Sequence, residues 1–96
     1  MKRWIDDLPQ IPFRYRDLPP DGPWMTMEEA GTHLGIGHYH MNALTAVTHR
    51  IDMVRTTGKE LAVTRASVEA EKHWRTTATV RQKLWRLFKD ILKNSL

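Results

Sequence analysis

The sequence predicts a mainly helical domain with one small β-hairpin, arranged as a winged helix-turn-helix with an extended N-terminal arm and an amphipathic C-terminal helix. Residues 26–49 have the pattern of two short helices joined by a glycine-containing turn. Residues 51–64 change toward the alternation of a β-hairpin. The last 18 residues repeat large apolar side chains at helical spacing.

Length and composition place all of this in one small domain. The chain has 96 residues, 41% of them apolar and 27% charged, as in an ordinary globular protein. We expect an arm at 1–23, the winged domain at 24–76 and the basic C-terminal helix at 77–96. The absence of cysteine excludes disulfides and thiolate zinc sites and fits a cytoplasmic protein. Because no apolar run is long enough to span a bilayer, we expect no membrane partner.

Positive charge accumulates toward the C-terminus. Residues 1–24 are balanced and residues 25–49 carry only two acidic groups, whereas residues 77–96 hold five basic and one acidic side chain. Such a gradient favours binding of a polyanion by the second half, although a merely solvated basic surface has the same composition.

The arm and the first helix follow from proline and capping signals. Five prolines in residues 1–23 disfavour a helix and predict an extended arm, whose Phe13 gains free energy by burial against the domain or a partner. The Thr26 hydroxyl is placed to cap a helix that runs to about Leu34, where Gly35 allows a tight turn.

The second helix is expected over 38–49, with Met41, Leu44 and Val47 pointing inward. The hairpin follows, and Gly58 is expected to supply the positive φ of its turn. Thr64 or Ser67 can then cap a third helix.

The C-terminal helix, 79–96, is expected to be strongly amphipathic. Its apolar face either packs on the core or forms a homodimer; a membrane-surface helix and a helix for another protein partner remain open. The residues expected to carry the self-association are Leu84, Leu87, Phe88 and Ile91.

The stretch from Trp24 to Trp74 resembles a known module. Its opening, Trp24 and Thr26 followed by Glu28-Glu29-Ala30, then Ile51 to Arg55, Gly58 and the run Val63 to Ala70, resembles the winged helix-turn-helix of phage excisionases and MerR-type regulators. Small terminase subunits of phages share the module. The resemblance covers about half of the chain. It implies that the second helix enters the major groove of double-stranded DNA and that the hairpin lies along the backbone or minor groove.

These observations predict a sequence-selective DNA-binding protein of phage or mobile-element type, either an excisionase-like recombination directionality factor or a small transcriptional repressor. An integrase or another phage protein is the expected second partner. Asn42 is placed to pair with an adenine edge, and the polar and basic side chains around it to contact bases or phosphates. The full set of expected DNA contacts is His38, Tyr39, Asn42, Thr45, His49, Arg50, Arg55, Lys59 and Arg65.

Other functions fit the residues less well. The histidines lack the three- or four-residue spacing of metal ligands on a helix, the glycines do not form a phosphate loop, and no motif assembles a catalytic triad, so we expect no enzyme, metal or cofactor. Two alternatives remain: a protein-interaction module that kept the fold without DNA contact, which the cation-poor second helix favours, and a small-terminase-like DNA-packaging subunit.

Overall fold

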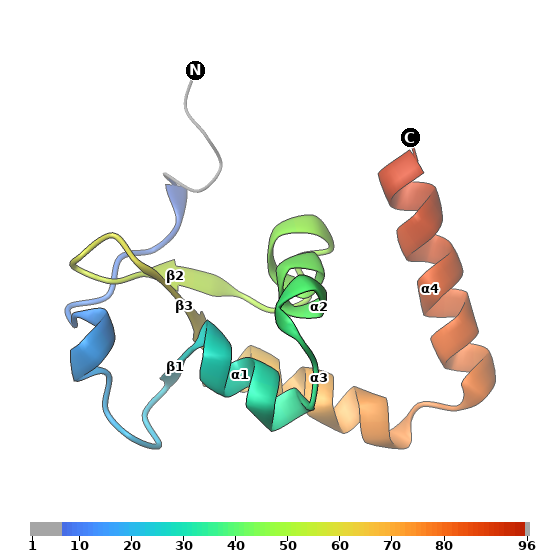
Figure 1. Ribbon diagram of the computed structural model, residues 1–96. Helices are drawn as coiled ribbons and strands as arrows, with labels where there is room; N and C mark the ends of the chain where they lie inside the picture. Colours follow the sequence, from blue (N-terminus) through green and yellow to red (C-terminus); the bar gives the residue numbers. More distant parts are fainter. Residues whose placement is uncertain (1–6, 96) are drawn as a thin grey trace.

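The computed structural model describes residues 7–95, with side chains described as far as Lys93. Within this range, four α-helices and a three-stranded antiparallel sheet form a mainly helical α/β domain (Figure 1). No helix among these residues is long and apolar enough to cross a membrane.

The sheet contains one strand more than the expected hairpin. Its strands are β1 (Trp24–Thr26), β2 (Met53–Arg55) and β3 (Leu61–Thr64), in the order β1-β3-β2. Met25 and Met53 both lie opposite Val63, on one face of the sheet. The extra strand forms because the chain before the first helix is extended and pairs with the edge of β3 that β2 leaves open.

Helices cover this face of the sheet. The helix α1 (Met27–Leu34) begins and ends as the sequence predicts: the Thr26 hydroxyl accepts a hydrogen bond from the Glu29 backbone at 3.0 Å, and Gly35 ends the helix at a φ of 70°. The buried cluster between sheet and helices comprises Met25, Ala30, Met41, Leu44, Ile51, Met53, Val63 and Val68.

The N-terminal arm covers the opposite face. Its backbone runs beside β2, with Ile11 N donating to the Arg55 carbonyl and Arg55 N to the Pro9 carbonyl, both at 2.8 Å. Ile11 is buried with Val54 and Ala62. The Phe13 ring lies 5.5 Å from that of Trp24, and the arm continues through a short 3-10 helix, η2 (Tyr15–Asp17). The described part of the arm is therefore packed on the domain itself.

The hairpin turn differs in detail from the prediction. The residue with positive φ is Lys59, at 64°, and not Gly58. The turn is held by side-chain and backbone bonds of Thr56, whose hydroxyl accepts from Glu60 N at 3.1 Å and whose carbonyl accepts from Lys59 N at 3.0 Å. These bonds place the left-handed position one residue later than the glycine.

Two longer helices follow the sheet. The helix α3 (Arg65–Thr77) is capped by Thr64, one of the two caps that the sequence allows, and packs against α1. An extended link at Ala78 leads to α4 (Val80–Ser95), which rises beside the rest of the domain in Figure 1.

Candidate nucleic-acid interface

An exposed polar surface lies on α2 (His38–Asn42). His38, Tyr39 and Asn42 are all exposed, and the Tyr39 side chain is 89% accessible to solvent. The rings of His38 and Tyr39 meet edge to face at 5.8 Å. Three of the expected contact residues therefore lie together on one accessible turn of helix.

The continuation of α2 rearranges this surface. Residues Ala43–Val47 form a π-helix, η3, in which the Thr48 backbone N–H donates to the Ala43 carbonyl five residues earlier. A π-helix has a wider turn than an α-helix, so the residues that follow it point in other directions than α-helical spacing predicts. Val47, predicted to point inward, is therefore exposed, and the prediction that Thr45 faces outward is wrong. Thr45 is 1% exposed, and its hydroxyl donates to the Met41 carbonyl at 2.8 Å.

The helical segment ends before His49, two residues earlier than expected. His49 is exposed and has a φ of 55°. It therefore lies in the loop that leads from η3 to β2 and not on the helix face with Asn42.

The hairpin carries two of the predicted cations. Lys59 is exposed in its turn, and Arg55 is half-buried on β2, beside the arm. In Figure 1 this turn projects on one side of α2, and α4 stands on the other. Residues 57–60 of the hairpin turn are exposed and therefore accessible to a large ligand.

Two other predicted cations have intramolecular partners. The Arg50 guanidinium binds the Asp90 carboxylate of α4 at 2.6 Å, and its Nε atom is buried without a hydrogen-bond partner among the described residues. Arg65 Nε donates to the Gly22 carbonyl at 2.6 Å. These two expected DNA contacts are therefore engaged within the chain: Arg50 links the loop before β2 to α4, and Arg65 links α3 to the arm.

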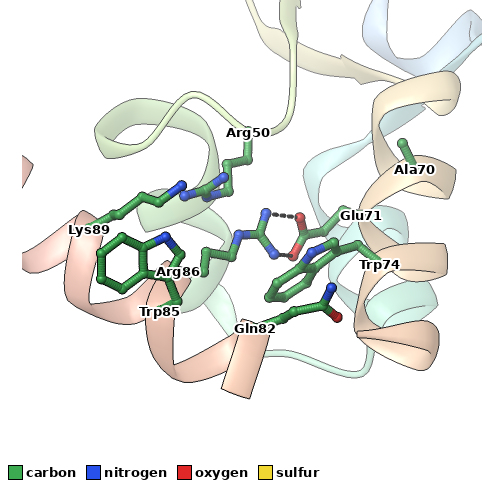
Figure 2. A pocket seen from close by; sticks show the side chains of 8 residues that line it. All are labelled: Arg50, Ala70, Glu71, Trp74, Gln82, Trp85, Arg86 and Lys89. Carbon is green, nitrogen blue, oxygen red and sulfur yellow. Dashed lines mark hydrogen bonds and ion pairs between the residues drawn. The ribbon is translucent and has the colours of Figure 1, made fainter. Parts of the chain in front are cut away.

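A buried ion cluster joins α3 to α4, and only a weak signal for it is present in the sequence. Glu71 is 4% exposed, and its carboxylate accepts from Arg75 Nε at 2.7 Å and from two nitrogens of Arg86. The Arg86 guanidinium also stacks on Trp74, 3.8 Å from the ring centre (Figure 2). The four-residue spacing of Glu71 and Arg75 predicts a pair on one helix, but nothing local predicts the link to Arg86.

Arg75 also holds a histidine neutral. Its Nη2 atom lies 2.9 Å from Nε2 of His40, which must accept because the guanidinium only donates. Burial and, after it, the charge of Arg75 lower the pKa of His40 below its ordinary value, against a smaller opposing effect of Glu71. His40 is therefore a neutral acceptor in this contact.

The residues expected to mediate self-association share one face of α4. Leu84, Leu87, Phe88 and Ile91 are each between 50% and 61% exposed. About half of each residue stays accessible to solvent, so α4 does not bury this face on the core.

Comparison with protein families, with curated proteins and with solved structures finds no match for this chain.

Proposed function

We propose that the chain is a DNA-binding protein of winged helix-turn-helix type. In this assignment α1 and α2 are the helix pair, α2 is the recognition helix and the β2–β3 hairpin is the wing. The observation that carries the proposal is the accessible face of α2, where Asn42 and Tyr39 have no competing role in the core.

The chemistry of this face suits base and phosphate contacts. An asparagine amide can donate and accept together at an adenine edge, and imidazole and phenol groups bond to phosphates without formal charge. The wing supplies the cation, because Lys59 is exposed in the turn. Phosphate contacts would position the protein, and Asn42 would provide most of the sequence preference.

The intramolecular contacts of the arginines limit the number of cations that the interface can offer to DNA. Arg50 and Arg65 are engaged within the chain, so we assign them structural roles. The proposed interface is accordingly small and weakly charged. A partner protein or repeated half-sites would be needed for tight binding, as in an excisionase-like factor acting with an integrase.

Gel-shift titration with duplexes from the chain's own genomic neighbourhood tests the proposal. Asn42→Ala is expected to weaken binding to the preferred duplex by about 1–3 kcal/mol and to relax its sequence preference. Lys59→Asn, a change that tolerates the positive φ, is expected to weaken binding to all duplexes alike. Lys93→Gln, a matched loss of charge on α4, serves as the control. Wild-type affinity in both test variants would contradict the proposal.

A specific observation supports a second candidate. The exposed apolar face of α4, together with the cation-poor face of α2, fits a module that binds another protein and no DNA. In that case no duplex shifts, and the variants of α2 and the hairpin have no phenotype.

A further inference from the structure

The helix α4 is attached to the domain by its charged side. Arg86 binds Glu71 and Asp90 binds Arg50, so these two positions face α3 and the loop before β2. In helical projection the apolar positions lie on the other side. Seven large apolar side chains of α4 are 46–75% exposed: Val80, Leu84, Trp85, Leu87, Phe88, Ile91 and Leu92. Trp85 and Leu87 form the two edges of this face, where each also lines a hollow between α4 and the domain (Figure 2 shows Trp85).

The size of this face matches one half of a protein interface. Aromatic side chains present about 150–250 Å² each and aliphatic ones somewhat less, so the exposed fractions leave apolar surface on the order of 600–800 Å². A specific interface buries about 800 Å² on each partner, whereas the largest apolar patch of an ordinary monomer is about 300–600 Å². The face is therefore large enough for a stable complex.

The spacing of the side chains fits a helical occupant. Val80, Leu84, Leu87 and Ile91 alternate intervals of four and three residues, the pattern of a coiled-coil seam. The stacked rings of Trp85 and Phe88, 5.7 Å apart, extend the seam along one side. A partner helix lying along α4 would cover this ridge.

Charge selects among possible partners. In helical projection the exposed cations Lys83 and Lys89 border the two edges of the face, and Arg81 lies at its N-terminal end. The single acidic residue of α4, Asp90, is paired with Arg50. A second copy of the chain would place these cations against one another, and like charges oppose association. A helix with acidic flanks would pair with them.

We propose that α4 is the docking site for an amphipathic helix of a partner protein, one with an apolar heptad face flanked by Glu and Asp. This interaction goes beyond DNA binding and does not depend on it. It gives the chain two surfaces, so that a protein recruited by α4 can be held beside DNA bound by α2.

Two synthetic peptides test the charge requirement on the full chain. Both have four heptads with Leu at positions a and d. One has Glu and the other Lys at positions e and g, and the like charges within each peptide also disfavour its self-association. Titration calorimetry is expected to give an affinity for the acidic peptide at least about tenfold above that for the basic one. Equal binding of the two, or no binding of the acidic peptide, would overturn the proposal.

Variants of the face connect that binding to α4. Leu84→Glu with Leu87→Glu is expected to abolish binding of the acidic peptide with an unchanged circular dichroism spectrum, because both side chains are exposed. Lys83→Glu with Lys89→Glu is expected to reverse the preference toward the basic peptide. Val47→Glu, the same kind of change at an exposed apolar residue outside α4, serves as the control and keeps binding.

Two further measurements separate the rival occupants. Sedimentation of the chain alone at tens of micromolar is expected to give the 11.3 kDa of one chain. Twice that mass, reduced to one chain by the Leu84 and Leu87 changes, would overturn the proposal in favour of a second copy. Binding to phosphatidylserine vesicles without binding of either peptide would overturn it in favour of a lipid surface.

The tests of α4 and of DNA binding are independent of each other. A chain that binds DNA but not the acidic peptide would refute this inference and leave the proposed function standing.

Discussion

The sheet core and α4 use the same kinds of side chain in opposite ways. In the core, Ile51, Val63 and Val68 are no more than 1% exposed, and each face of the sheet is covered, one by helices and the other by the arm. In α4, leucines and aromatic rings are about half exposed, and polar contacts attach the helix to the domain. Apolar residues therefore stabilise the fold in one region and remain available for recognition in the other.

The two regions also differ in the kind of force that positions them. Apolar burial is non-directional and scales with area, so it gives the core its cohesion. The carboxylate of Glu71 and the guanidinium of Arg86 contribute less net free energy but require a defined geometry. The ion cluster thus fixes the orientation of α4 without covering its apolar face.

The largest effect on the free energy of unfolding should come from truncating a large aliphatic side chain to alanine, a change made once in the sheet core and once in α4. Ile51→Ala is expected to lower the free energy of unfolding by about 2–5 kcal/mol, because it leaves a cavity in the core. Leu84→Ala removes a similar side chain from an exposed position and is expected to change it by no more than about 0.5 kcal/mol. Urea unfolding measures both values. A loss at Leu84 comparable to that at Ile51 would mean that the face of α4 is buried in solution.

A smaller effect should follow from neutralising the ion cluster. Glu71→Gln is expected to lower the free energy of unfolding by about 1–3 kcal/mol, since Arg75 and Arg86 lose a buried carboxylate partner. Amide hydrogen exchange should become faster in α4. In β3 it should become faster only as far as the lower free energy of global unfolding requires. Glu69→Gln, the same change at a half-exposed carboxylate on α3, serves as the control and should cost less than about 1 kcal/mol. Unchanged exchange in α4 would refute the role of Glu71.

The smallest effect concerns the contact between α2 and α3. Burial and the charge of Arg75 lower the pKa of His40 in the folded chain. As pH falls, the unfolded chain therefore takes up a proton at this residue before the folded chain does. The contribution of neutral His40 to the free energy of unfolding is complete above the ordinary histidine pKa of about 6.5. It is lost as pH falls toward the lower pKa of the folded chain. His40→Gln, which still accepts from Arg75, should flatten the acid side of the stability profile measured by urea unfolding. Parallel profiles for the two proteins would contradict this account.

Local chemistry made much of the fold predictable. Thr26, Gly35 and Thr64 act through backbone groups within three or four residues, so their caps follow from sequence. The hairpin was predicted in the right place for the same reason. The first strand was missed because β1 is short and forms only by pairing with β3, far along the chain.

The candidate site was harder to predict, because distant contacts decide it. Thr45 lies four residues after the buried Met41, so ordinary helical spacing already places it on the inward face, against the prediction. Val47 is exposed at the end of a π-helix, Ala43–Val47, which no local signal marks. Arg50 was expected to contact DNA, but its partner Asp90 lies 40 residues later. His38, Tyr39 and Asn42 precede the π-turn, and their exposure was predicted correctly.

Binding to duplex DNA as a function of salt tests the central claim most directly. If α2 and the hairpin contact phosphates, affinity for a duplex from the genomic neighbourhood should fall by about three- to tenfold between roughly 50 and 200 mM salt, as expected for one or two neutralised phosphates, with a shallower slope for Lys59→Asn. An affinity independent of salt, or no binding even at the lower concentration, would contradict the assignment of this surface to DNA.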